Sequence, residues 1–332
     1  MRQRELGRTG IRVSSIGLGC WGMSGSYGPA DESESIATLH RALDLGINFI
    51  DTADSYGEDG HNESLVGGAI ASRRGEFVLA TKTGWVKRPD PDGNPVIGVD
   101  GSPKRIVSAC DASLARLKTD VIDLYYLHRI DPDVPVEDSI GAMSELVKAG
   151  KIRFLGLSEV AESTLRRAHA VHPITALQSE FSLWTREPEA AVLPACRELR
   201  ISFVPFSPLG RGFFTGAVKG REVIASGDWR EGNPRFSDEN LAKNLALLEP
   251  LEAIAKAHGK TLAQVALAWV LSRGEDVIPI PGMKRRGHLE ENVGAVDIVL
   301  TPAELAKIDA AFSPGAAAGD RYTPEVAKWA GR

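Results

Sequence analysis

Short runs of apolar, largely β-branched residues alternate with longer segments of helical period along almost the whole chain. This alternation is typical of repeated strand–helix units, whose strands form a parallel sheet covered by helices. Eight such runs are present, which fits an α/β fold of the (β/α)8 TIM-barrel type. The predicted strands cover residues 14–19, 47–52, 76–81, 121–127, 153–158, 175–180, 202–207 and 276–281.

Segments that predict helices lie between these strands. Residues 33–46 carry an apolar face and end at Gly46, and residues 136–151 end in the same way near Gly150. Residues 2–13 predict an N-terminal β-hairpin that closes the bottom of the barrel. A chain of 332 residues, 43% of them hydrophobic, is long enough for one such barrel. We therefore predict a single domain over residues 1–332.

The regular alternation stops between Gly210 and Pro250, after the seventh predicted strand. Glycines, charges and isolated aromatic residues follow one another there without a sustained period. Loops of this length are usually functional, and barrel active sites form at the C-terminal ends of the strands. We interpret the segment as a long loop that either covers a cofactor or is a tolerated surface insertion.

Charge and cysteine content narrow the classes of partner. A net charge of -5 gives no basic stripe for a nucleic-acid backbone or an anionic membrane, so we expect neither partner. Cys20, Cys110 and Cys196 are odd in number and lack C-x-x-C spacing, which predicts no disulfide framework and no metal site. The N-terminus lacks an apolar signal core, so we expect a cytoplasmic protein. The oligomeric state stays open.

Four side chains able to move a proton stand at or just after strand ends: Asp51, Tyr56, Lys82 and His128. Taken singly, Asp51 could be a cap of the following turn and Tyr56 a loop cover. Lys82 could be a solvated cation, and His128 a core histidine. Because parallel strand ends meet at one face, we expect the four to converge. Lys82, held by Asp51, would lower the pKa of Tyr56, and His128 would aim a donor at a carbonyl oxygen. This predicts general acid catalysis with oxyanion stabilisation, which still needs a hydride source.

The blocks around these residues resemble the aldo-keto reductase superfamily. They include NFIDTADSYG (48–57), LATKTG (79–84), LYYLHR (124–129), GLSE (156–159), PFSPLGRGFFTG (205–216) and IPGMKRRGHLEEN (280–292). These sequence blocks are most similar to the branch of the superfamily that contains pyridoxal reductases and general aldehyde reductases. The resemblance implies a (β/α)8 barrel that reduces small aldehyde or ketone carbonyls with NADP(H). It also implies Tyr56 as proton donor, Lys82 and Asp51 as its supporting pair, and His128 as the residue that orients the carbonyl.

The resemblance further implies a set of cofactor contacts, with Phe206 stacked on the nicotinamide and Ser158 and Gln178 at its carboxamide. Independently, basic residues at the start of a predicted helix favour a bound phosphate, hence NADP over NAD; the alternative is a solvated helix start. Glu159 stands where many relatives have asparagine. The complete set is Cys20, Trp21, Asp51, Ser158, Glu159, Gln178, Phe206, Ser207, Pro208, Leu209, Gly210, Arg211, Gly282, Lys284, His288, Glu291 and Asn292.

Trp21, Tyr27 and Trp85 follow the first and third strands and would form an aromatic wall beside Tyr56 and His128. This favours small aromatic or apolar aldehydes, unless the tryptophans merely pack under loops. The sequence leaves two other functions open. One is a cofactor-binding regulatory subunit similar to the potassium-channel β-subunits, with little turnover. The other is a Schiff-base barrel aldolase in which Lys82 is the nucleophile.

Overall fold

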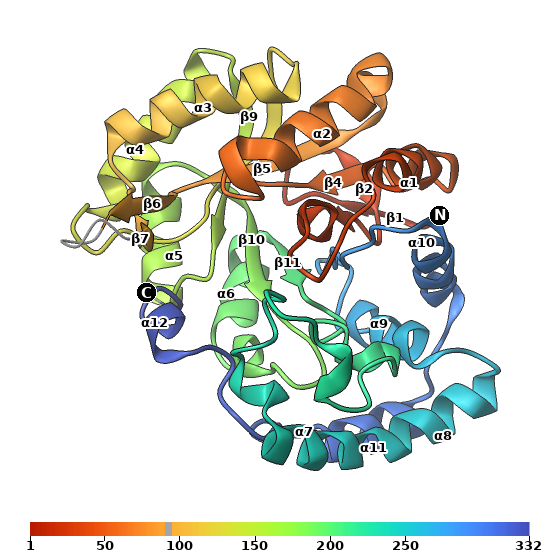
Figure 1. Cartoon of the computed structure of the whole chain (residues 1–332). Coiled ribbons are helices and arrows are strands. Elements are labelled where there is room, and N and C mark those ends of the chain that lie inside the picture. The colour runs from red at the N-terminus through yellow and green to blue at the C-terminus, as the bar shows by residue number, and fades with distance from the viewer. Residues whose placement is uncertain (90–94, 332) are drawn as a thin grey trace.

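Parallel strands and surrounding helices alternate along the chain, as the sequence pattern predicts (Figure 1). The computed structural model describes residues 1–89 and 95–331. Within them, the main sheet runs in the order β11-β10-β9-β8-β5-β4-β3 with every neighbouring pair parallel. Its strands are β3 (Leu18–Gly19), β4 (Phe49–Asp51), β5 (Val78–Thr83), β8 (Ile122–Leu127), β9 (Ile152–Ser158), β10 (Ile174–Glu180) and β11 (Ser202–Phe206).

The eighth predicted strand, residues 276–281, closes the sheet into a barrel between β11 and β3. Ile278 and Ile280 donate their amides to the β11 side, to Phe203 O at 2.8 Å and Pro205 O at 2.9 Å. Pro279 and Pro281 alternate with them and accept from glycines near β3. Proline has no amide hydrogen, so pairing consists of isolated bridges rather than a continuous ladder.

The N-terminal hairpin consists of β1 (Gln3–Glu5) and β2 (Arg12–Ser14), paired antiparallel. Leu6 and Val13 are fully buried and pack in one cluster with barrel-interior side chains, among them Phe49. The hairpin therefore closes one end of the barrel interior, and the prediction for residues 2–13 is confirmed.

Helices cover the outside of the barrel (Figure 1). They are α1 (Glu32–Asp44), α2 (His61–Ile70), α3 (Pro103–Leu117), α4 (Val136–Lys148), α5 (Glu162–Val171), α6 (Val192–Leu199), α7 (Asp238–Leu245), α8 (Glu249–His258), α9 (Leu262–Leu271), α10 (Arg286–Val293), α11 (Pro302–Ala311) and α12 (Pro324–Ala327). Short 3-10 helices are η1 (Trp21–Ser24), η2 (Glu58–Gly60), η3 (Ala71–Glu76), η4 (Glu187–Glu189), η5 (Phe213–Thr215), η6 (Arg221–Val223), η7 (Pro234–Phe236), η8 (Ala246–Leu248) and η9 (Gly294–Asp297). Gly46 and Gly150 follow α1 and α4 with left-handed backbone, as predicted.

Two excursions from the barrel bear on the site. A second hairpin, β6 (Trp85–Pro89) and β7 (Pro95–Val99), leaves the end of β5 and was not predicted from the sequence. The segment after β11 is less irregular than expected, because α7 forms inside it with Ser237 as N-cap. This segment reaches across to the residues after β3, where Trp229 packs edge-on against Trp21 with ring centroids 5.7 Å apart.

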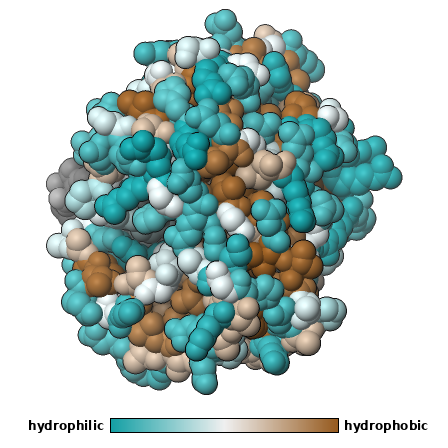
Figure 2. Space-filling view, turned by 90° about the vertical axis from the view of Figure 1, so that its right-hand side faces the viewer, coloured by the Kyte–Doolittle hydropathy of each residue, from teal (hydrophilic) through white to brown (hydrophobic). Residues whose placement is uncertain are grey.

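The side of the molecule that carries α1 and α10 is mainly hydrophilic, with apolar residues in a broken band across it (Figure 2). In the part of the chain that the structure describes, no helix combines the length and the apolar character required to cross a membrane.

Candidate active site

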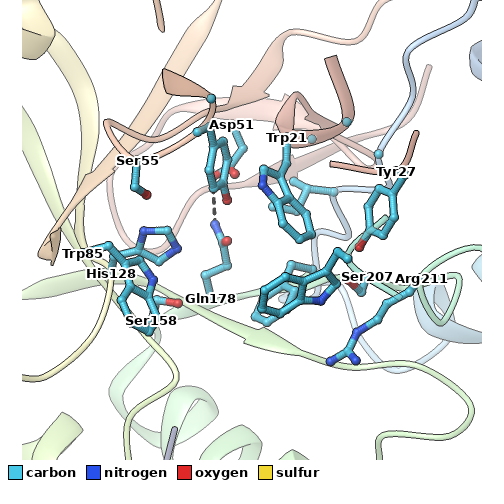
Figure 3. A pocket seen from close by; sticks show the side chains of 18 of the residues that line it. Trp21, Tyr27, Asp51, Ser55, Trp85, His128, Ser158, Gln178, Ser207 and Arg211 are labelled. Atoms are coloured by element: carbon cyan, nitrogen blue, oxygen red, sulfur yellow. Dashed lines mark hydrogen bonds between the residues drawn. The ribbon is translucent and has the colours of Figure 1, made fainter. Parts of the chain in front are cut away.

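A cavity of about 1090 Å³ opens at the C-terminal ends of the barrel strands. This is slightly larger than typical pockets for drug-sized ligands, which measure roughly 300–1,000 Å³. Trp85, His128 and Ser158 lie on one side of it, and Trp21 and Tyr27 on the other (Figure 3). The cavity thus has room for a long cofactor together with a small second molecule.

Lys82 is fully buried at the end of β5 and its ammonium has a partner for each of its donors. It donates to Asp51 Oδ1, to Thr52 O at 2.8 Å and to the Tyr56 hydroxyl at 3.0 Å. Gln178 Nε2 donates to Asp51 Oδ2 over 2.8 Å, shown as the dashed line in Figure 3. Buried charges need such pairing. Strand ends far apart in sequence therefore hold Tyr56 against a fixed cation, as predicted.

Burial and charge set the protonation of these groups. Burial acts to lower the pKa of Lys82, but the charges of Asp51 and Tyr56 outweigh it and raise the pKa, so the ammonium persists at neutral pH. For Tyr56 the prediction of a lowered pKa is wrong. Burial raises the pKa of its phenol, and the nearby Lys82 offsets only part of that rise. Tyr56 is therefore protonated at pH 7 and available as a donor.

His128 follows β8 and faces Tyr56 edge-on, with ring centroids 5.9 Å apart. Burial, together with the charges of Lys82 and Arg129, lowers its pKa well below the ordinary value. The imidazole is consequently neutral at physiological pH. Its Nδ1 is buried without a hydrogen-bond partner among the described residues, so a proton on Nε2 leaves a neutral donor for an oxygen in the cavity.

Most residues in the predicted cofactor set line this cavity. Cys20, Glu159, Gly210, Glu291 and Asn292 are not among its lining residues. Those that do line it are Trp21, Asp51, Ser158, Gln178, Phe206, Ser207, Pro208, Leu209, Arg211, Gly282, Lys284 and His288. Tyr27, Tyr56, Trp85 and His128, from the predicted substrate set, also line it.

Gly210, in the turn after β11, is closely packed against aromatic side chains. Ser207 and Arg211 adopt left-handed backbone, and Gly210 lies between them with φ of 56°. A Cβ on Gly210 would lie 2.8 Å from both Trp184 Nε1 and a Phe214 ring carbon. Packing beneath the turn therefore requires glycine at this position.

The basic segment at α10 already has partners. Lys284 Nζ donates to three backbone carbonyls after η1, at 2.8 Å to Tyr27 O, 3.0 Å to Gly28 O and 2.8 Å to Pro29 O. Glu34 accepts from the Arg286 amide at the start of α10 and pairs with its guanidinium at 2.9 Å. A phosphate at this helix start would share donors with a carboxylate.

Glu159 turns away from the cavity. Its carboxylate accepts from both Nη atoms of Arg321, at 2.5 and 3.1 Å, and from the amide of Glu180 at 2.7 Å. Arg321 belongs to the C-terminal segment, which the contact ties to the end of β9. Glu159 belongs to the predicted cofactor set, but its partners are protein groups and it is not among the residues that line the cavity.

Several lining residues escaped the sequence analysis. Tyr322 and Val326 come from the C-terminal segment, and no local pattern marks them. Arg129 carried a signal, because it follows His128 directly in the block LYYLHR. Trp229 and Arg230 come from the long segment after β11, which was considered as a cofactor cover. Over residues 1–89 and 95–331, no cluster of His, Cys, Asp and Glu could hold a metal ion.

Comparisons with known proteins place the chain in a family. The protein matches the model of the aldo/keto reductase family over residues 15–312. It is 46% identical over 321 residues to a probable aldo-keto reductase 1 from Glycine max, covering 96% of this chain and 91% of the relative.

Two solved structures are similar throughout. The glycerol dehydrogenase AKR11B4 from Gluconobacter oxydans superposes with a TM-score of 0.85 at 29% identity, covering 94% of this chain and 95% of that one. The thermostable aldo-keto reductase Tm1743, in complex with the inhibitor epalrestat, gives 0.73 at 31% identity, covering 94% and 100%. The chain therefore belongs to the aldo/keto reductase family of oxidoreductases.

Proposed function

We propose that the protein reduces the carbonyl group of a small aldehyde or ketone to an alcohol, with NADPH as the hydride donor. The contact of 3.0 Å between Lys82 Nζ and the Tyr56 hydroxyl at the cavity wall carries this proposal. A protonated phenol held by a fixed ammonium is suited to donating a proton to an oxygen that gains negative charge.

The residues divide the work as follows. Neutral His128 donates to the carbonyl oxygen and sets its direction. Tyr56 gives its proton to that oxygen, and Lys82, fixed by Asp51, stabilises the resulting phenolate. NADPH, when bound, supplies the hydride to the carbonyl carbon.

The dinucleotide would lie along the lining residues after β11 and near α10. Phe206 ends β11 half-buried at the cavity and offers a ring face for the nicotinamide. Lys284, whose partners are backbone carbonyls rather than carboxylates, supplies positive charge on the same wall, which suits a phosphate group. This charge, with Arg285 just before α10, favours NADPH over NADH.

A Schiff-base role for Lys82 is disfavoured by its surroundings. Its ammonium is fully occupied, its pKa is raised, and it is fully buried. Nucleophilic lysines need a lowered pKa and access to substrate.

The test is NADPH oxidation with a panel of aldehydes and ketones that includes pyridoxal, using wild type and Tyr56→Phe. We expect turnover in wild type and a loss of roughly 100-fold or more in the variant, as for removal of a general acid. Tyr27→Phe removes the hydroxyl of another cavity tyrosine and should retain most of the turnover. Unchanged rates in Tyr56→Phe, or NADPH binding without turnover of any carbonyl, would contradict the proposal.

A further inference from the structure

Arg129 is a buried cation on the cavity wall, directly after His128. Its side chain belongs to a residue only 6% exposed. Nη1 donates to His128 O at 2.6 Å and to Ser158 Oγ at 3.1 Å. Nε is buried and has no hydrogen-bond partner within the described residues. A guanidinium has five donors, so most of its capacity is unused.

The other arginines that line the cavity all have a carboxylate partner. The pairs are Arg105 with Asp54 at 2.9 Å, Arg116 with Glu63 at 2.6 Å, Arg211 with Glu180 at 2.8 Å and Arg230 with Asp228 at 2.6 Å. Arg129 forms no ion pair in residues 1–89 and 95–331, in contrast to these four.

The charge of Arg129 affects the pKa of the nearby Glu159, but Glu159 does not serve as the counterion of Arg129. Burial acts to raise the pKa of Glu159, and the charges of Arg321 and Arg129 outweigh it, so the pKa is lowered. The hydrogen bonds of this carboxylate nevertheless go to Arg321, Ser179 Oγ and the Glu180 amide. A buried charge left without a partner is costly.

Arg129 lies near His128, the residue proposed to orient the carbonyl, with Trp85 between them. Its guanidinium carbon lies 5.3 Å from the Trp85 ring centroid, and the Trp85 ring lies 6.1 Å from that of His128. Trp85 and His128 share one side of the cavity (Figure 3). An anion bound to Arg129 would therefore sit next to the place where His128 and Tyr56 hold a carbonyl.

We propose that Arg129 binds a carboxylate of the substrate, so that the preferred substrates are carbonyl compounds that also carry a carboxylate group. This rests on the proposed carbonyl reductase function. A planar carboxylate matches the guanidinium fork and would compensate its charge. The aromatic rings of Trp85 and Trp21 suit an apolar body between the two polar groups of such a substrate.

The test compares two aldehydes of the same shape, 4-formylbenzoate and its methyl ester, as substrates with NADPH. Wild type should have the higher kcat/KM for the acid. Arg129→Gln keeps an amide donor for His128 O and Ser158 but removes the charge, so the preference for the acid should fall by roughly 30-fold or more. Arg129→Lys keeps the charge without the fork and should retain part of the preference.

Binding gives a second readout that needs no turnover. 4-(Hydroxymethyl)benzoate and its methyl ester are titrated against the NADPH complex by calorimetry, because an alcohol and NADPH cannot react with each other. The acid should bind more tightly than the ester in wild type, and Arg129→Gln should remove the difference. Lys87→Met, at the exposed rim of the cavity, makes the same change in net charge. This control should keep the difference in affinity between the acid and the ester.

The outcomes separate the alternatives. An acid-to-ester ratio that is equal in wild type and in Arg129→Gln overturns the proposal. So does a variant that weakens NADPH and both aldehydes to the same degree, because Arg129 would then serve the cofactor. Failure of the underlying reductase function would appear differently, as no turnover of either aldehyde in wild type. Unfolding midpoints verify that each variant is folded. If Arg129→Gln is not folded, the acid-to-ester ratio of Arg129→Lys tests the proposal instead.

Discussion

Lys82 donates to the hydroxyl of Tyr56 over 3.0 Å from a position that solvent does not reach. The same ammonium is bonded to Asp51, so it cannot turn away from the phenol without leaving a buried carboxylate unpaired. Burial nonetheless dominates the phenol and raises its pKa above the ordinary value near 10. The site therefore holds the protonated phenol, ready to donate, over the whole physiological pH range.

Reduction should depend little on pH between about 6 and 9, because Tyr56 stays protonated there and His128 stays neutral. Reduction should decline only as pH rises through the raised pKa of Tyr56. Alcohol oxidation needs the phenolate as base, so its rate should increase with pH over the same range. Profiles of kcat/KM in both directions measure this. A reduction rate that halves between pH 6 and 8 would contradict a phenol with a raised pKa.

Lys82→Met should lower turnover by roughly 100-fold or more, because it removes the cation beside the proton donor. It should also destabilise the fold by about 3–5 kcal/mol, because Asp51 remains buried without its ion pair. The double variant Lys82→Met with Asp51→Asn removes both charges. Denaturant unfolding should show much of the stability regained, whereas turnover should stay low. Recovery of turnover in the double variant would mean that Lys82 serves only to neutralise Asp51.

Gly67 marks where α2 meets α3 at backbone distance. A Cβ there would lie 2.4 Å from Leu117 Cα and 2.6 Å from Leu117 O. Gly67→Ala should therefore destabilise the fold by about 1–3 kcal/mol, since backbone cannot move aside as a side chain can. The adjacent Gly68 is the matched control, because its nearest neighbour would be Lys118 Nζ at 3.9 Å. Gly68→Ala should stabilise by about 0.5–1 kcal/mol in the same unfolding experiment.

The preference for NADPH over NADH should depend on the charges of Lys284 and Glu34, which lie near the start of α10. Lys284→Ala should reduce the preference for NADPH over NADH by roughly tenfold, the size expected for one bond to a charged group. Glu34→Gln should strengthen NADPH binding and leave NADH nearly unchanged, because the Glu34 carboxylate occupies the helix start that a phosphate would use. Dissociation constants from cofactor fluorescence give both ratios. An unchanged ratio in both variants would place the ribose phosphate elsewhere.

The local hydrophobic pattern was sufficient to locate the ends of the strands. Asp51, Lys82 and His128 could therefore be predicted to converge. A period of two or 3.6 residues records which side faces the core, and parallel strands then align their ends. Long-range partners leave no such record. Nothing near residue 284 indicates that its ammonium would meet the carbonyls of residues 27–29, and nothing near Glu159 indicates a partner 162 positions away. The pKa of Tyr56 was misjudged for a related reason, because sequence reveals the neighbouring cation but not the depth of burial.

The contact between Glu159 and Arg321 should hold the C-terminal wall of the cavity in place. Arg321 O accepts from Arg211 Nη1 at 2.8 Å and from Asn233 Nδ2 at 2.9 Å, and the next residue, Tyr322, lines the cavity. Gly331 also donates its amide to Glu159 O at 2.9 Å. Loss of the Glu159 charge should therefore loosen a segment that lines the cavity while leaving Tyr56 and Lys82 intact.

Glu159→Gln should raise the KM for aldehydes more than it lowers kcat, and it should increase hydrogen exchange in residues 313–331. Breaking this pair leaves Arg321 with only Glu180 at 4.0 Å, a carboxylate that already pairs with Arg211, and should cost up to about 3–5 kcal/mol. Adding Arg321→Met removes the charge that has lost its main partner, so the double variant should regain global stability. It should not regain a low KM, because the anchor itself is missing. If the KM and the exchange of this segment both return to wild-type values in the double variant, the C-terminal wall is held by apolar packing around Tyr322 rather than by the ion pair.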